Sequence, residues 1–380
     1  NTNMNKKLYI CIYILFFLTM MMLGSVYTYT VYRPFIENKF QVTISISGLP
    51  YMFSLGFFSI SMIVTGKLMR KVALKILIII GSMLLMTSWI GAALSNSILM
   101  FTLFYGVFMG ISVGIFYGAA LQFVQRYATH HSGFFVGVML LAFGLSSVIL
   151  APTSRYVLDV YSLQTLFLYY ALFSGIVTIP LVVIYPYDHQ NLDQKAYQSI
   201  PYLRLLIIFT LSSMIGLMMI GLTYTIGTDY YKFDAVDVAL VVSGLALLNA
   251  LSRPFFGYLI DQLGFEKTAM VSIGSIVIAS IINSLNLGFS LFLFGLGYSI
   301  YWFNLGAWLS IMPNYIKKKF GKDLYAALYG KVFLGYGISA LLGTLFSSVI
   351  LDFFGNTLYL YIFILLLAFI LFLFVRKESI

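Results

Sequence analysis

Charged residues and cysteine are scarce in this sequence, and each scarcity excludes a class of protein. Lysine, arginine, aspartate and glutamate make up 9% of the 380 residues, whereas a soluble domain carries roughly 25%. Hydrophobic residues reach 61%, with a mean hydropathy of +0.98. The composition therefore indicates an integral membrane protein. A single cysteine, Cys11, excludes an intrachain disulfide.

Histidine is scarce as well, which bears on chemistry. His130, His131 and His189 are all expected in loops, and no metal-ligand spacing or nucleophile motif accompanies them. The adjacent His131 and Ser132 are more typical of a solvated turn than of a catalytic dyad. We therefore expect no enzymatic activity, no metal site and no cofactor.

Long uncharged stretches locate the membrane spans, because about 20 apolar residues cross a bilayer as a helix. Two stretches, residues 76–125 and 268–316, are too long for one span and are expected to break at Asn96 and near 286–288. Six further stretches hold one span each: residues 8–32, 40–66, 132–154, 160–187, 205–228 and 357–375. Segments around Arg253 and Lys331 supply two more. The prediction is an all-α membrane protein with twelve transmembrane helices.

The basic residues set the orientation of these spans. Of the 22 lysines and arginines, sixteen fall on one side and two within spans, at Arg253 and Lys331. The other four fall on the opposite side: Arg33, Lys39, Arg155 and Lys232. This bias predicts that both termini are cytoplasmic. The net charge of +10 then reflects topology and not nucleic-acid binding, although lysines 317–319 could also contact acidic lipids.

A polar segment divides the predicted spans into two sets of six. We predict an N-terminal half at residues 1–187, a cytoplasmic linker at 188–202 and a C-terminal half at 203–380. The first span ends in MMMLGSVYTYT and the seventh in LMMIGLTYTIG. This similarity favours parallel six-helix repeats whose first helices face a shared central cavity.

Glycines recur every four residues in two predicted helices. Gly106, Gly110, Gly114 and Gly118 share one face of the fourth span, and Gly133, Gly137 and Gly144 lie in the fifth. Small residues let helix backbones approach each other in lipid. We interpret both sets as helix-packing contacts.

The two cations within spans are the strongest functional signal. None of the twelve acidic residues falls deep within a predicted span. Taking helix ends near Ile260 and Leu324, Arg253 and Lys331 each lie about 10 Å inside, at 1.5 Å per residue. Charges at this depth cost at least about 2.5–3.5 kcal/mol and usually face a wet cavity. An anion bound between them would relieve their repulsion; the alternatives are snorkelling and, for Lys331, loss of its proton.

The loop after the eighth span resembles a signature of the major facilitator superfamily. It carries Gly257, Asp261, Gly264 and Lys267 at the signature spacing. The resemblance implies a conformational latch in which the aspartate pairs across neighbouring helix ends. In the equivalent loop after the second span, Gly66 and Leu68 match, but Arg70 stands where the aspartate is expected.

Five motifs together resemble the oxalate/formate antiporter family of that superfamily: YTYTVYRP, GIFYG, HSGFFVGVMLLAFGLSSVILAP, LSRPFFGYLIDQLG and ALYGKVFLGYGISALLG. The resemblance implies that Arg253 and Lys331 bind substrate carboxylates and that Tyr27 and Tyr117 line the pocket. Val26 stands where the oxalate exchanger has a polar residue, which leaves the identity of the acid open.

These observations lead to one predicted function and two alternatives. We expect a multi-pass, monomeric carrier that exchanges small mono- or dicarboxylates across the plasma membrane or an organellar membrane. Proton-coupled monocarboxylate symport is the first alternative, although it often uses an intramembrane acid or histidine that this chain lacks. A carboxylate sensor that transports nothing is the second. Aromatic residues that could also cover the substrate are Tyr29, Tyr224, Trp302 and Trp308.

Overall fold

The computed structural model describes residues 5–42, 44–128, 130–187 and 202–379. Within these ranges the chain forms helices joined by turns, and it contains no strand. Ten helices in the same ranges are long and apolar enough to cross a membrane. The predicted all-α membrane class is therefore confirmed. The predicted linker at residues 188–202 lies outside the described residues apart from Tyr202.

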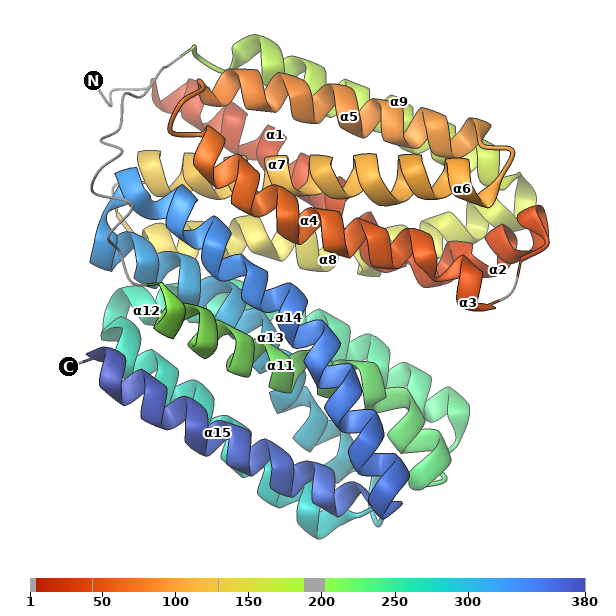
Figure 1. The fold of residues 1–380 in the computed structure, drawn as a ribbon, viewed down its shortest axis with the longest axis vertical. Helices are drawn as coiled ribbons and strands as arrows, with labels where there is room; N and C mark the ends of the chain where they lie inside the picture. The colour runs from red at the N-terminus through yellow and green to blue at the C-terminus, as the bar shows by residue number, and fades with distance from the viewer. Residues whose placement is uncertain (1–4, 43, 129, 188–201, 380) are drawn as a thin grey trace. The chain divides into compact units, whose positions relative to one another are not determined.

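Two compact units divide the chain. Unit 1 consists of Asn1–Thr129, Ala142–Ile200 and Phe320–Leu334. Within it α4 packs on α7, and α5 packs on both α7 and α9 (Figure 1). The elements that lie wholly in unit 1 are α1 (Lys6–Leu23), the 3-10 segment η1 (Gly24–Thr28), α2 (Tyr29–Phe40), α3 (Ile44–Ser47), α4 (Leu49–Leu68), α5 (Leu74–Leu94), α6 (Ile98–Phe101), the π segment η2 (Thr102–Phe108), α7 (Met109–Tyr127) and α9 (Leu163–Ile184).

Unit 2 consists of His130–Leu141, Pro201–Lys319 and Gly335–Ile380. In it α15 packs on both α11 and α12. Its elements are α11 (Leu203–Thr225), the π segment η3 (Ile226–Tyr230), α12 (Ala235–Asn286), α13 (Leu291–Phe320, of which only Phe320 belongs to unit 1) and α15 (Thr357–Ser379).

Two long helices contribute to both units. The helix α8 (Ser132–Val160) has its first residues, up to Leu141, in unit 2 and continues in unit 1 from Ala142. The helix α14 (Lys322–Phe354) begins in unit 1 and continues in unit 2 from Gly335. Each unit therefore contains a part of a helix that continues into the other.

Both breaks predicted within the long apolar stretches are confirmed. The first lies between α5 and α6, where the Ser97 side chain caps α6 by accepting a hydrogen bond from the Met100 amide at 3.2 Å. The second lies between α12 and α13, where Leu287 and Gly288 have φ angles of 40° and 94°. Side-chain capping and left-handed backbone both end helices.

The helix that carries Arg253 extends further than predicted. We expected it to end near Ile260, but α12 stays helical until Gly264, whose φ of 77° and ψ of 179° interrupt its 52 residues. This backbone conformation is open essentially only to glycine. Nothing between Ile260 and Gly264 disfavours a helix, so the break falls at the glycine. The predicted end was therefore wrong by one turn.

The predicted glycine contact of the fourth span is confirmed. Gly106, Gly110, Gly114 and Gly118 all face α4. A methyl group added at Gly110 would overlap the carbonyl oxygen of Ser54, and one added at Gly114 would overlap the Ser61 side chain. The Ser61 hydroxyl donates to the Ile111 carbonyl at 2.8 Å, which ties α4 to α7. Close backbone approach therefore holds these helices together.

Candidate functional site

Arg253 lies in the middle of the first arm of α12 and is 2% exposed. Its Nη1 donates to the carbonyl oxygen of Leu140 on α8 at 2.5 Å. Its Nε is buried and forms no hydrogen bond with any described residue. It also forms no ion pair within the described part of the chain. A buried guanidinium is thus held by one backbone carbonyl, with donors left over.

A close contact between α8 and α12 brings that carbonyl to the arginine. Gly133 lies against Gly257, and Gly137 lies against the backbone of Arg253 and Pro254. A methyl group on any of these glycines would overlap the opposite backbone. Because helix positions three or four residues apart share a face, Leu140 follows Gly137 along the same contact. Two glycines on α8 and one on α12 therefore set the distance at which Arg253 meets its acceptor.

Pro254 adds a local weakness beside the arginine. A proline inside a helix has no N–H, so it leaves the carbonyl four residues earlier without its helical hydrogen bond. For Pro254 that carbonyl belongs to Ala250, one turn before Arg253. The helix next to the buried charge consequently lacks one backbone hydrogen bond of a regular helix.

The predicted latch residues lie at the other end of the same contact. One carboxylate oxygen of Asp261 lies 3.3 Å from Nζ of Lys318, and the other accepts a hydrogen bond from the Phe134 amide at 3.1 Å. Lys318 also donates to the Ile260 carbonyl at 2.9 Å. Asp261 thereby joins α12 to the first turn of α8 and to the end of α13.

The other latch residues differ in their environment. Gly257 makes the backbone contact with α8, and Gly264 provides the break in α12. Lys267 is exposed. In the related loop after α4, Gly66 packs closely against Ala326 of α14, and Arg70 is 7% exposed. A cavity of about 10 Å³ beside Gly66, room for about one water, is lined by Met62, Gly66, Met69, Gly118, Tyr325, Ala326 and Tyr329.

Lys331 lies in the part of α14 that belongs to unit 1, whereas Arg253 belongs to unit 2. Its helix begins at Lys322, two residues before the predicted start near Leu324. Lys331 is partly buried. The preceding Gly330 packs against the carbonyl of Met62 on α4. Lys331 is therefore nine residues into its helix rather than seven.

The structure brings together the two tyrosines that the family resemblance singled out. Tyr27, in η1, and Tyr117, in α7, both pack edge-on against Phe143, with ring centroids 5.5 Å and 5.4 Å away. Tyr117 also contacts Phe58 and Phe333. Phe333 comes from α14, two residues after Lys331. This aromatic cluster thus joins η1, α4, α7, α8 and α14 within unit 1.

Tyr29 lies elsewhere in unit 1. Its hydroxyl donates to the Ser47 carbonyl at 2.6 Å, and its ring contacts Tyr51 and Tyr105. It therefore holds the short helix α3 against α2. The neighbouring Val26 is 3% exposed.

The three aromatic candidates of unit 2 differ in exposure and bonding. The indole N–H of Trp302 donates to the Thr223 hydroxyl at 2.9 Å, and that of Trp308 donates to the Ser272 hydroxyl at 2.8 Å. Tyr224 is 47% exposed. Both tryptophans therefore use their only polar atom to join α13 to a neighbouring helix.

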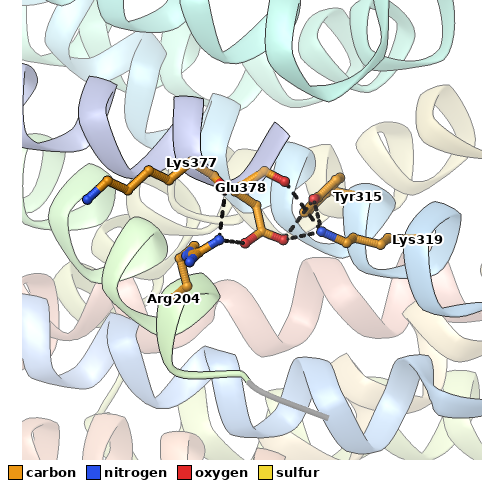
Figure 2. A network of polar contacts seen from close by, with 5 residues as sticks. All are labelled: Arg204, Tyr315, Lys319, Lys377 and Glu378. Carbon is orange, nitrogen blue, oxygen red and sulfur yellow. Dashed lines mark hydrogen bonds and ion pairs between the residues drawn. The ribbon is translucent and has the colours of Figure 1, made fainter. Parts of the chain in front are cut away.

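An ionic cluster that the sequence reasoning missed lies at the end of α13. Figure 2 shows the Glu378 carboxylate between Arg204 and Lys319, at 3.6 Å and 2.5 Å. The Tyr315 hydroxyl donates to it at 2.9 Å. Burial alone would lower the pKa of Lys319, but its hydrogen bonds to Glu378 and Tyr315 raise that pKa overall. Lys318 and Lys319, considered above for acidic lipids, are thus engaged by Asp261 and Glu378.

Comparison with known proteins places the fold in a family. The profile of the Major Facilitator Superfamily matches residues 11–319. The uncharacterized MFS-type transporter YhjX of Escherichia coli (strain K12) is 24% identical over 341 residues, which cover 85% of this chain and 84% of that protein. The oxalate:formate antiporter of Oxalobacter formigenes is 24% identical over 283 residues, which cover 71% and 67%.

Solved structures share the fold across nearly the whole chain. The fucose:proton symporter FucP of Escherichia coli aligns with a TM-score of 0.75 and 15% identity, covering 98% of this chain and 99% of that one. The human organic anion transporter MFSD10 (TETRAN) aligns with a TM-score of 0.76 and 13% identity, covering 97% and 99%. These relatives and the proteins of these solved structures are transporters and not enzymes. The profile match spans most of the 380 residues, so the chain belongs to the Major Facilitator Superfamily.

Proposed function

We propose that this transporter carries small carboxylate anions across the membrane by alternating access, and that it does so by exchange. The observation that supports this most directly is Arg253, a buried guanidinium with one backbone partner and an unpaired Nε. Arginine keeps its charge under all ordinary conditions. An anionic substrate would supply the counter-charge that the described protein residues do not.

The chemistry of the arginine favours a carboxylate. A guanidinium offers five N–H donors in a planar fork that matches the two oxygens of a carboxylate. One donor of Arg253 is used by Leu140. The remaining donors can still grip both oxygens of one carboxylate. The relative named as an oxalate:formate antiporter supports the same substrate class.

The distribution of buried charge favours exchange over proton coupling. Among the described residues, the charged residues that are buried as a whole are both arginines, Arg70 and Arg253, and the largely buried acidic side chains of Asp261 and Glu378 are each paired with a lysine. Proton-coupled carriers often use a buried acidic residue or histidine to bind and release the proton. Without such a group, the return of the empty site would depend on a second anion.

Lys331, Tyr27 and Tyr117 complete the proposed site. We assign a second point charge to Lys331 and the cover over the apolar part of the acid to the tyrosines around Phe143. Tyr29, Tyr224, Trp302 and Trp308 stay predicted contributors. The latch role of Gly257, Asp261, Gly264 and Lys267 is likewise part of the proposal.

The proposed topology has twelve spans. The ten candidate helices count α12 once, although Gly264 divides it into two arms, and α13 adds a further 30-residue helix. We propose halves at residues 1–187 and 203–380, both termini in the cytoplasm, and a monomer in the plasma membrane. An impermeant thiol reagent should fail to label a cysteine placed at Lys319 from outside.

A panel of carboxylates tests the function directly. Formate, lactate, pyruvate, oxalate and malonate are added to the purified protein, and the thermal unfolding midpoint is measured. At least one acid should raise the midpoint, and the same acid should enter proteoliposomes faster when they are loaded with a carboxylate. If no acid changes the midpoint and none is taken up, the proposal is wrong.

Removing the second charge sharpens the substrate assignment. Lys331→Gln should spare a monocarboxylate, because one carboxylate can still dock on Arg253. Uptake of oxalate or malonate should fall far more than uptake of formate. Equal losses for all acids would remove Lys331 from the proposed site.

A further inference from the structure

The bond between Arg253 and α8 is unusual in its acceptor. An arginine is almost never fully buried unless it is paired, and Nη1 of Arg253 donates to an uncharged backbone carbonyl, that of Leu140, at 2.5 Å. A backbone carbonyl cannot swing away as a side chain can. The guanidinium is therefore anchored to the axis of α8.

The glycine contact makes this anchor close and stiff. Gly137 lies one turn before Leu140 on α8, and its missing side chain lets the backbone of α8 touch Arg253 and Pro254. One helical turn further toward the start of α8, Gly133 repeats the contact with Gly257. The position of the Leu140 carbonyl relative to Arg253 is thus fixed by backbone contacts on α8 and α12.

The anchor leaves the Nε of the guanidinium without a hydrogen bond to any described residue. With Nη1 turned to Leu140, the unpaired Nε lies on the side of the group that it shares with Nη2. These two nitrogens present parallel N–H donors, which is the geometry of a bidentate bond to a carboxylate. The Leu140 carbonyl does not need to compete with an anion, because it uses another donor of the five.

We propose that the Leu140 carbonyl and Gly137 are positioning groups for the anion site: they hold the guanidinium of Arg253 so that its Nε edge faces the substrate. This inference rests on the proposed function and adds to it the part played by α8. A side chain that is already ordered loses less freedom when the ligand binds. Weakening the anchor should therefore weaken anion binding without changing any residue that touches the anion.

The decisive variant weakens the carbonyl and leaves every side chain in place. Replacing Leu141 with its α-hydroxy analogue converts the bond between residues 140 and 141 into an ester, whose carbonyl is a poorer acceptor. The same change at Met139 is the control, because it weakens the Val138 carbonyl of the same helix and also removes one helical N–H. Dissociation constants for formate, oxalate and malonate are measured by thermal shift and by inhibition of uptake.

The expected results separate positioning from general damage. The ester at Leu141 should raise the dissociation constants about three- to tenfold, whereas the ester at Met139 should change them by less than about twofold. Both esters should lower the ligand-free unfolding midpoint, the Leu141 ester somewhat more because it also weakens the buried bond from Arg253. Unchanged or tighter binding in the Leu141 ester overturns the inference. If the wild type binds none of the acids, the proposed function fails and this inference fails with it.

A conventional substitution gives a second measurement. Gly137→Ala should separate α8 from α12 and raise the same dissociation constants, with no such effect from Gly244→Ala, since a methyl group at Gly244 on α12 would meet nothing within 4 Å. Loss of stability in Gly137→Ala with unchanged affinity would mean that the glycine serves packing alone.

Discussion

Two glycine-lined helix contacts in this transporter use the same packing device for different purposes. Between α4 and α7, glycines spaced four residues apart face both the backbone and the side chains of α4, and no charged residue lies among their nearest neighbours in the described part of the chain. Between α8 and α12, glycines spaced four apart face backbone, and the contact carries a charged residue at each end, Arg253 and Asp261. The first contact holds two helices together.

The second contact also fixes where charges sit. One end pairs the Asp261 carboxylate with the first turn of α8, and the other end pairs a guanidinium with a carbonyl about two turns further along the same helix. A helix dipole leaves partial positive charge on the first N–H groups of a helix, which explains why an acid lies at that end. The comparison teaches that glycine spacing alone indicates that two helices pack closely. The charged residues at the ends of such a contact indicate its function.

The largest expected effect comes from removing the charge of the second contact. Arg253→Gln should weaken carboxylate binding about ten- to hundredfold, because it removes charged hydrogen bonds. Arg253→Lys should restore little, since a lysine lacks the planar fork. Uptake of radiolabelled acids by proteoliposomes measures both. Unchanged uptake of every acid in Arg253→Gln would make the arginine structural.

The first contact should respond in stability and not in binding. Gly110→Ala places a methyl group against the Ser54 carbonyl, and overpacking of this kind costs about 1–3 kcal/mol. The unfolding midpoint should fall while carboxylate affinity stays constant. Gly56→Ala on α4, where a methyl group would meet nothing within 4 Å, is the matched control. If Gly110→Ala lowered carboxylate affinity and not stability, the two contacts would not differ in function as proposed.

The Asp261 end of the second contact should act on the conformational balance. Asp261→Asn removes the ion pair with Lys318, whose side chain is 42% exposed, so a shift of about two- to fivefold is expected. Asp323→Asn, at an exposed position in the first turn of α14, should have no such effect. Conformation-selective crosslinking of cysteine pairs measures the balance, and equal shifts would contradict the latch assignment.

The smallest effect is expected outside both contacts, at Glu378. Glu378→Gln weakens the pairs of a carboxylate that is 8% exposed with Lys319 and Arg204, whose side chains stay in contact with solvent at 39% and 48% exposed. Such pairs contribute less than about 1 kcal/mol, and salt screens them. The unfolding midpoint should fall slightly at low salt and converge with the wild type at high salt. A large fall that persists in salt would show that the cluster matters more than its exposure suggests.

The sequence predicts packing better than it predicts bonding. The glycine ladder from Gly106 to Gly118 and the breaks at Asn96 and near 286–288 follow from spacing and polarity, which are local properties. Arg253 also stood out from the sequence, because a charge in an apolar run is costly wherever the run folds. These features depend on few distant partners.

Two of the three missed features depend on distant partners. The Leu140 carbonyl has no signature, because every residue carries the same backbone group. The end of the first arm of α12 fell one turn later than predicted, at the positive φ of Gly264. The Glu378 cluster joins residues from α11, α13 and α15, and single charges near predicted helix ends do not reveal their pairing.

The lengths of α8 and α14 make this protein sensitive to the thickness of its bilayer. With 29 and 33 residues, at 1.5 Å per residue they are about 44 Å and 50 Å long, against a hydrocarbon core of about 30 Å. Such helices must tilt or extend into the headgroup region. Transport in vesicles of short-chain and long-chain lipids should therefore proceed at different rates.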